Sequence, residues 1–358
     1  MKPWMVLALV FVTTGAAQAQ PPSVPAPRTE VPIRDVVLSD GAHRYAVPIR
    51  IGGTQIEAGL DTGSPGLRVL SAALPAGDAK PADDGALVAE FGSGTTLQGP
   101  SGTAQVSIGG VTGQTALQLV KHAGCAPDHP QCPAGAIPAA QFGILGDGLP
   151  GEGFKALLGL SMATTEPGNP LVRLGVKRWI IELPRPGEGL PGRLILNPSD
   201  AEVASYVRLP IVASFSNQQN ALHDAILGCF SKAATREHFC GALTFDTGTP
   251  GIQVLSPKVI SPPWADGTVA TLLFQDSTGR VQAVERLVIG VRSHASHLTF
   301  TALPAGGDTL IAAGLTPYFA YSVLYDAEQG LIGFKPRTPS QGGPQALSLA
   351  PAGVPGQR

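Results

Sequence analysis

Short apolar runs separated by turn residues make up most of the chain. Residues 45–61 are apolar at alternate positions on either side of Gly52 and Gly53, which predicts two strands joined by a tight turn. Residues 86–110 predict a second hairpin with a glycine-rich tip, and residues 321–336 predict a third. Further strands or apolar segments ended by turns are expected at 142–149, 192–200, 206–212, 224–230, 270–275, 284–291 and 298–303. The pattern predicts an all-β protein.

Helices are expected to be few and short, with residues 152–160 as one candidate. The composition agrees, because 45 glycines and 34 prolines favour turns over long helices. A chain of 358 residues can form one large or two medium domains. The formal net charge is −2, and the sequence suggests no basic patch. Nucleic acid and anionic membrane surfaces are therefore not predicted as partners.

The first nineteen residues have the order of an export signal. Lys2 supplies the positive start, residues 5–12 form an apolar core, and Ala-Gln-Ala at 17–19 is a cleavage site. The apolar core is too short to span a bilayer, and the residue directly after the cleavage site is not a cysteine that could carry a lipid anchor. We therefore expect residues 1–19 to be a signal peptide and the mature protein to be periplasmic or secreted, without a membrane anchor.

The four cysteines form two local pairs along the sequence: Cys125 with Cys132, and Cys229 with Cys240. Four cysteines allow three connectivities, and an oxidising compartment favours disulfides over free thiols. We predict nearest-neighbour pairing because each bond then closes one short loop. The alternative is a zinc site in which His122 and His129 join Cys125 and Cys132. That site needs reduced thiolates, which export disfavours, so no metal is predicted.

One polar turn segment occurs twice in the sequence, beginning at Asp61 and at Asp246. The eleven-residue segments that begin there are identical at eight positions, and each follows an apolar strand. A single Asp-Thr-Gly is typical of an Asx turn, but two copies with matching flanks predict two related β units. Gly63 and Gly248 leave room for a close approach of the backbone. The hydroxyls of Ser64 and Thr249 can donate a hydrogen bond to the neighbouring carboxylate.

These turns resemble the catalytic turns of the bilobal, pepsin-like aspartic peptidases. Residues 192–200 are similar to that family's crossover strand between its lobes, and residues 310–336 are similar to its closing segment. Gly314 and the segment Ile144-Leu145-Gly146 resemble the apolar-Gly segments that accompany each turn. Many members also place a small disulfide loop where Cys229 and Cys240 lie. The similarity covers roughly residues 41–336.

The resemblance implies an all-β, bilobal fold with two similar barrel-like lobes and a cleft between them. The expected division is a Pro-rich N-terminal linker at 20–40, a first lobe at 41–200, a second lobe at 201–336 and a disordered tail at 337–358. It also implies an exported endopeptidase that works as a monomer, without a cofactor, on a peptide or protein substrate bound in the cleft.

The family mechanism, carried over to this chain, makes Asp61 and Asp246 a catalytic pair. Two adjacent carboxyls share one proton over a wide pH range, because both cannot ionise cheaply at close range. The charged member activates a water molecule, and the protonated member polarises the scissile carbonyl. The supporting residues implied are Thr62, Gly63, Ser64, Thr247, Gly248 and Thr249; the threonines would cross-link the turns, and Ser64 and Thr249 would orient the carboxylates.

Two positions depart from the family's pattern. The flap hairpin normally carries a tyrosine before Gly-x-Gly, whereas Phe91 precedes Gly92, Ser93 and Gly94 here. Arg68 stands where many members have a tryptophan that bonds to that tyrosine. The two changes are consistent with each other, and they indicate a divergent bacterial branch with lower or narrower activity.

Two other classes of function are alternatives to the peptidase. A pepsin-like protein can be catalytically weak or inactive and bind a peptide, glycan or partner protein, but such relatives usually lose one aspartate or its flanking residues. Other hydrolases are disfavoured, because no Gly-x-Ser-x-Gly, P-loop or His-Glu-x-x-His motif occurs. His294 and His297 are expected in a surface turn and not in a metal site.

Overall fold

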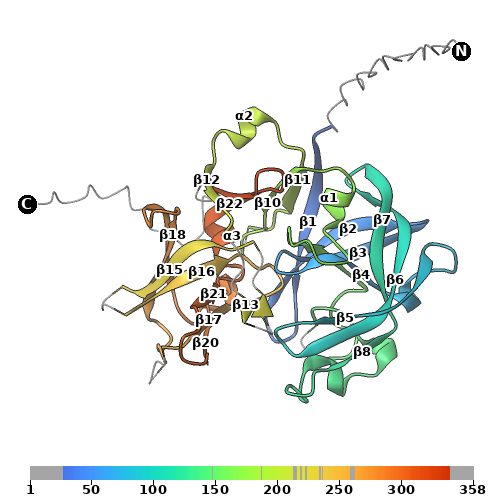
Figure 1. Cartoon of the computed structure of the whole chain (residues 1–358), viewed down its shortest axis with the longest axis horizontal. Helices are drawn as coiled ribbons and strands as arrows, with labels where there is room; N and C mark the ends of the chain where they lie inside the picture. Colours follow the sequence, from blue (N-terminus) through green and yellow to red (C-terminus); the bar gives the residue numbers. More distant parts are fainter. Residues whose placement is uncertain are drawn as a thin grey trace, which may run out of the picture.

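The computed structural model describes residues 27–338, except 147, 187, 213–215, 218–219, 222–223, 234, 236 and 259–262. The predicted signal peptide and nearly all of the predicted tail lie outside these residues. Strands dominate the described part (Figure 1), and its α-helices are short: α1 (Pro170–Arg173), α2 (Asp200–Val203) and α3 (Thr316–Ala320). The prediction of a mostly β protein with few short helices is confirmed.

Most strands belong to one large, fourteen-stranded sheet. Its members are β1 (Thr29–Val37), β2 (His43–Ile51), β3 (Thr54–Asp61), β4 (Pro65–Leu70), β5 (Lys80–Glu90), β6 (Thr95–Ile108), β7 (Val111–Val120), β8 (His122–Cys125), β9 (Ala156–Leu160), β10 (Arg178–Glu182), β11 (Gly192–Leu196), β12 (Val207–Pro210), β22 (Tyr321–Asp326) and β23 (Leu331–Pro336). Pairing of β10 with β22 joins the middle of the chain to its end. The sheet therefore crosses the boundary expected near residue 200.

A second sheet of seven strands is built from the C-terminal part of the chain. It contains β15 (Ile226–Lys232), β16 (His238–Thr244), β17 (Ile252–Ser256), β18 (Val269–Gln275), β19 (Val281–Val288), β20 (Leu298–Ala302) and β21 (Leu310–Ala312). In Figure 1 these yellow and orange strands gather on one side, and β1–β8 gather on the other. The short strands β13 (Ser216–Asn217) and β14 (Asn220–Ala221) pair with each other.

The three predicted hairpins are confirmed. Strands β2 and β3 meet across the turn at Gly52-Gly53, with Ile51 opposite Thr54. Strands β5 and β6 form the hairpin with the glycine-rich tip, and β22 and β23 form the C-terminal one. Buried positions alternate with less buried ones over part of β2, β3 and β6, as a period-two pattern requires, whereas β22 is buried at every position.

Two expectations drawn from the sequence are wrong. Residues 152–160 were a helix candidate, but Ala156–Leu160 form strand β9, which is buried along its whole length between β3 and β4. Residues 29–37 were placed in a linker, but they form β1, which pairs with β11 and then with β2. Val31 and Ile33 anchor this strand because they belong to the main hydrophobic core.

The chain repeats one local arrangement in its two halves. Strand β9 runs parallel to β3 and antiparallel to β4, and β21 runs parallel to β16 and antiparallel to β17. A Cβ added to Gly159 would lie 2.6 Å from the Ser64 oxygen, and one added to Gly314 would lie 2.8 Å from the Thr249 oxygen. Gly159 is therefore the counterpart of Gly314, and the sequence assignment of that position to Gly146 is wrong.

Both predicted disulfides are present, Cys125–Cys132 with an S–S distance of 2.07 Å and Cys229–Cys240 with 2.02 Å. The sulfurs at 125 and 132 are thus bonded to each other, which contradicts the zinc alternative. Extracellular and periplasmic proteins commonly carry such bonds, in line with the expected localisation. Among the described residues, no helix is long and apolar enough to cross a membrane.

Candidate active site

The two Asp-Thr-Gly turns meet at one place. Asp61 ends β3, and Asp246 lies two residues beyond β16. A Cβ added to Gly63 would lie 2.4 Å from the Asp246 carboxyl carbon, and one added to Gly248 would lie 2.8 Å from Asp61 Oδ1. Each glycine therefore faces the carboxylate of the other turn, at a distance that a larger residue would prevent.

Each carboxylate is held by its own turn in nearly the same way. Asp61 Oδ1 accepts hydrogen bonds from the amides of Gly63 (2.8 Å) and Ser64 (3.2 Å), and its Oδ2 accepts one from Ser64 Oγ at 2.5 Å. Asp246 Oδ1 accepts from the Gly248 amide, and its Oδ2 accepts from Thr249 Oγ1, both at 2.7 Å. These bonds fix the orientation of both groups.

The turns are cross-linked by their threonines. The Thr62 amide donates to Thr247 Oγ1 at 3.1 Å, and the Thr247 amide donates to Thr62 Oγ1 at 3.0 Å. Each hydroxyl also donates at 2.8 Å to the carbonyl oxygen preceding the opposite aspartate, that of Phe245 or Leu60. Both threonines are buried, so the network is rigid and shielded from competing water.

Two tyrosines extend this network. The Tyr318 hydroxyl on α3 lies 3.0 Å from Thr62 Oγ1 and 2.6 Å from the hydroxyl of Tyr325 on β22. Both residues lie in the segment 310–336 that resembles the family's closing segment. No spacing or motif in the sequence marks either tyrosine as part of the site.

Burial distinguishes the two carboxyls. Asp61 is 3% exposed, whereas Asp246 is partly open to solvent. Burial and the charge of Asp246 raise the pKa of Asp61, and its hydrogen bonds from Ser64 and Gly63 oppose that rise only in part. A carboxyl in this setting keeps a proton at pH values where a free aspartate has lost it. The arrangement can therefore supply a proton donor and a base side by side.

Arg44 on β2 contacts the second turn from the first half of the chain. Its Nη1 donates to the Gly248 carbonyl at 2.9 Å, and its Nε donates to the Leu145 carbonyl at 3.0 Å. No motif in the sequence marks Arg44, because its partners are backbone oxygens 101 and 204 residues away.

The predicted flap residues Phe91, Gly92, Ser93 and Gly94 connect β5 to β6. The Gly94 carbonyl accepts from the Ala126 amide at 2.8 Å, and β6 pairs with β8 so that Thr95 lies opposite Cys125. A Cβ added to Gly94 would lie 2.2 Å from His129 Cβ. The tip thus rests on the Cys125–Cys132 loop. Among the described hydrogen bonds, none joins it to Asp61 or Asp246.

Arg68 links the first turn to the flap hairpin. Its Nη2 donates to the Pro65 carbonyl at 3.2 Å, and its Nη1 donates to Gln118 Oε1 at 2.9 Å. Gln118 Nε2 in turn donates to the carbonyls of Leu87 on β5 (2.9 Å) and Leu97 on β6 (3.1 Å). The sequence identified Arg68 only as a position where a flap partner is lost, but here a different connection to the flap hairpin exists.

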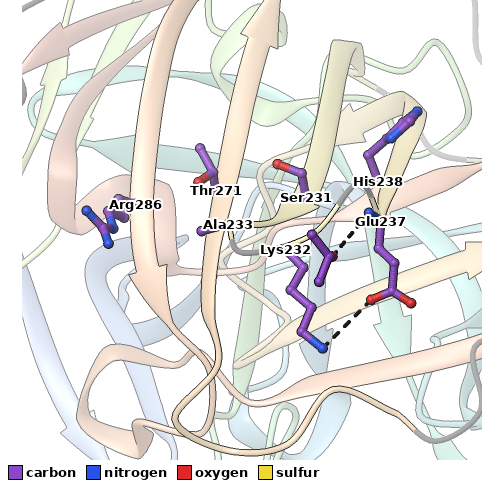
Figure 2. Close-up of a pocket in the computed structure, with 8 residues that line it drawn as sticks. Ser231, Lys232, Ala233, Glu237, His238, Thr271 and Arg286 are labelled. Carbon is purple, nitrogen blue, oxygen red and sulfur yellow. Dashed lines mark hydrogen bonds and ion pairs between the residues drawn. The ribbon is translucent and has the colours of Figure 1, made fainter.

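One concave region lies away from the two turns. A hollow of about 440 Å³ lies on β15, β16, β18 and β19, and it is lined in part by Lys232, Glu237, His238 and Arg286. Figure 2 shows these side chains. Lys232 and Glu237 form an ion pair across the hollow at 3.8 Å. His238 begins β16 and Asp246 follows its other end, a separation of about 25 Å along the strand. The hollow is therefore separate from the site at the two turns.

The remaining histidine prediction concerns His294 and His297. They lie in a turn, since a 3-10 helix covers Arg292–His294 and Ala295 has a left-handed φ of 49°. The expected turn is confirmed. Within the described part of the chain, no group of three or more His, Cys, Asp or Glu side chains is arranged to hold a metal ion.

Comparison with known proteins adds no family assignment. A search against models of protein families found no match for this chain, and a search of curated proteins found none either. The geometry of the two turns is therefore the main basis for a functional conclusion.

Proposed function

We propose that this protein is an exported aspartic endopeptidase with a bilobal, pepsin-like fold, in which Asp61 and Asp246 hydrolyse peptide bonds. The observation that carries this proposal is the reciprocal geometry of the two turns. Each turn orients its own carboxylate, each threonine bonds across to the other turn, and each glycine faces the opposite carboxylate. An ordinary Asx turn requires none of these contacts with a second turn.

The reaction follows from two carboxyls that share one proton. The ionised member removes a proton from a water molecule held between them, and the water oxygen attacks the peptide carbonyl carbon. The protonated member transfers its proton to the carbonyl oxygen, and the product is a tetrahedral diol. The carboxyl that took a proton from water then gives it to the nitrogen, while a diol hydroxyl returns a proton to the other carboxylate; the C–N bond breaks, and the pair again holds one proton. The apparent pKa values of this cycle belong to the pair and not to Asp61 or Asp246 alone.

The two repeated β arrangements support the bilobal part of the proposal. Each of them, β3–β4–β9 and β16–β17–β21, delivers one aspartate, and neither makes a complete site alone. We place the substrate as an extended peptide over the two turns, with the hairpin tip at Phe91–Gly94 covering it. The two disulfides support export to the periplasm or the medium.

The test is cleavage of a denatured protein mixture at several pH values, with and without pepstatin. We expect pepstatin to stop cleavage, and Asp61→Asn or Asp246→Asn to lower the rate by about 10²–10⁴-fold, as expected when an acid or base is lost. Asp308→Asn is the matched control, because Asp308 is exposed and remote from both turns in the sequence. Full activity in either Asn variant contradicts the proposal. A folded wild-type chain that binds pepstatin-like peptides without cleaving them indicates a binding protein.

A further inference from the structure

Arg68 is a buried cation in surroundings that are otherwise uncharged. It lies on β4 between β7 and β9, opposite Gln118 on one side and Leu157 on the other. Neither of these neighbouring strands contains a charged residue. Arg68 is 7% exposed and Gln118 is fully buried, so water cannot solvate the guanidinium group well. Burying a charge in this way is costly unless an opposite charge compensates it.

The hydrogen bonds of Arg68 supply no such charge. Its Nη atoms donate to the Pro65 carbonyl and to the Gln118 amide oxygen, which are both neutral. Its Nε has no hydrogen-bond partner among the described residues. Within that same part of the chain no carboxylate forms an ion pair with Arg68.

The charged groups on the elements packed around Arg68 point elsewhere, with one exception. On β5, Lys80, Asp83 and Glu90 are exposed, and β6 has no charged residue. His122 on β8 is exposed, and Lys155, just before β9, donates to the Phe142 carbonyl. The exception is Asp61, which lies opposite Gly159 on β9, whereas Arg68 lies opposite Leu157, two positions away on the same strand. Arg68 also donates to the Pro65 carbonyl at the end of the turn that begins with Asp61. Burial lowers the pKa of Arg68 to about 10, and attraction to Asp61 opposes that change. Arg68 is therefore positively charged throughout the acid and neutral range.

We propose that Arg68 is the fixed counter-charge of the Asp61/Asp246 pair and so sets the pH range over which that pair keeps a single proton. This inference rests on the proposed function, in which the singly protonated pair is the active form. A pair that holds one proton carries one negative charge, which the Arg68 cation balances in a poorly solvated region. Arg68 acts through the aspartates and is thus a positioning residue.

The direction of the effect follows from the sign of the charge. A nearby cation favours the ionised form of a carboxyl, so it lowers the pH at which each proton of the pair is lost. When the charge is removed, both transitions should move to higher pH together. Loss of the hydrogen bonds to Gln118 alone should not move them, because the cation remains in place.

Four variants at Arg68 and Gln118 separate the effect of the Arg68 charge from the effect of its hydrogen bonds. Arg68→Met removes both, and Arg68→Gln removes the charge but keeps polar atoms that can bond to Gln118. Arg68→Lys keeps the charge without the forked geometry. Gln118→Leu keeps the charge and breaks the link to the flap hairpin. The second neutral variant also guards against the case in which the methionine variant does not fold.

The decisive measurement is an NMR titration of the full chain labelled with ¹³C at the aspartate carboxyls, with Asp61 assigned by its loss in Asp61→Asn. We expect both transitions of the pair to rise by about one pH unit in Arg68→Met and Arg68→Gln, and to stay in place in Arg68→Lys and Gln118→Leu. Titrations of the folded neutral variants that superimpose on the wild type overturn the proposal. This readout needs no peptide cleavage, so it can fail or succeed separately from the proposed function. If cleavage is observed, both limbs of the pH profile of kcat/KM should shift in the same direction.

Discussion

At the scale of single residues, Asp61 and Asp246 differ more in burial than in bonding, although Asp61 also accepts a hydrogen bond from the Ser64 amide. Both receive an amide and a hydroxyl from their own turn, at nearly equal distances. Asp61 is almost completely buried, and this is the main cause of its raised pKa. The near-identity of the two sequence segments correctly predicted the shared bonding. The difference in burial comes from neighbours that the repeat does not include.

Glu285 gives a prediction for stability against pH. It is buried on β19, its Oε2 has no hydrogen-bond partner among the described residues, and burial raises its pKa to about 8. The folded chain therefore holds this proton while the unfolded chain releases it near pH 4.5, so stability falls as pH rises from about 4.5 to about 8. We expect Glu285→Gln to remove the contribution of Glu285 to that slope and to raise the free energy of unfolding at pH 7 by up to about 3 kcal/mol.

Urea unfolding of the wild type and the variant at pH 4, 6 and 8 measures this difference. Glu90→Gln is the control, since Glu90 is an exposed carboxylate on β5. Its curve should follow that of the wild type. Parallel curves for Glu285→Gln and the wild type over the whole range are the outcome that rules out a buried, protonated Glu285.

At the scale of elements, the hairpin of β5 and β6 is tied to the Cys125–Cys132 loop at its tip. Gly94 has a φ of 78°, and a methyl group there would collide with His129. Gly85 on β5 also has a positive φ, of 93°, but a Cβ there would meet nothing within 4 Å. An alanine at Gly85 adds backbone strain alone, whereas an alanine at Gly94 adds strain and also disturbs the contact with the disulfide loop. Comparing the two variants therefore separates these effects.

We predict that Gly94→Ala frees the hairpin tip and that Gly85→Ala does not. Hydrogen exchange of the amides at 91–97 should speed up by about tenfold or more in Gly94→Ala, because the loop that covers the tip must move away. If the proposed function holds, KM for a peptide should rise as well. Equal exchange rates in the two variants would mean that strain, and not the disulfide loop, controls the tip.

The sequence of strand β9 does not distinguish a strand from a helix. Ala-Leu-Leu-Gly-Leu has no polar position, since the strand is buried on both sides, and an apolar run of this length has no period that separates helix from strand. The sequence also contains two apolar-apolar-Gly strings thirteen residues apart, at Gly146 and Gly159. Only the pairing of β9 with β3 and β4 shows that Gly159 is the glycine beside the first turn. No local property of either string distinguishes the two glycines.

At the scale of the whole molecule, the two halves share a core and several polar links. One hydrophobic cluster includes Leu60 from the first half and Phe245 from the second. Arg44 adds hydrogen bonds from β2 to the Gly248 carbonyl beside the second aspartate. We therefore expect the halves to unfold in one cooperative transition.

Arg44→Met tests that link. We expect the free energy of unfolding to fall by about 1–3 kcal/mol, because carbonyl oxygens of Gly248 and Leu145 lose a charged donor. Arg50→Met is the control on the same strand: Arg50 is exposed and bonds to Gly53 and Gln55 within its own hairpin, and its loss should cost less than about 0.5 kcal/mol. Denaturant unfolding compares the two, and an equal loss in both variants excludes a special role for Arg44.

The sequence by itself determined the β class, the three hairpins, the disulfide partners and the two Asp-Thr-Gly turns. These features depend on contacts between residues close in the chain, so short patterns carry them. The tertiary structure alone decided that Tyr318 and Arg44 join the two turns, and that Arg68 is buried with a hydrogen bond to the first turn. Such contacts link residues far apart in the chain through backbone oxygens and shared burial, and those leave no local pattern to detect.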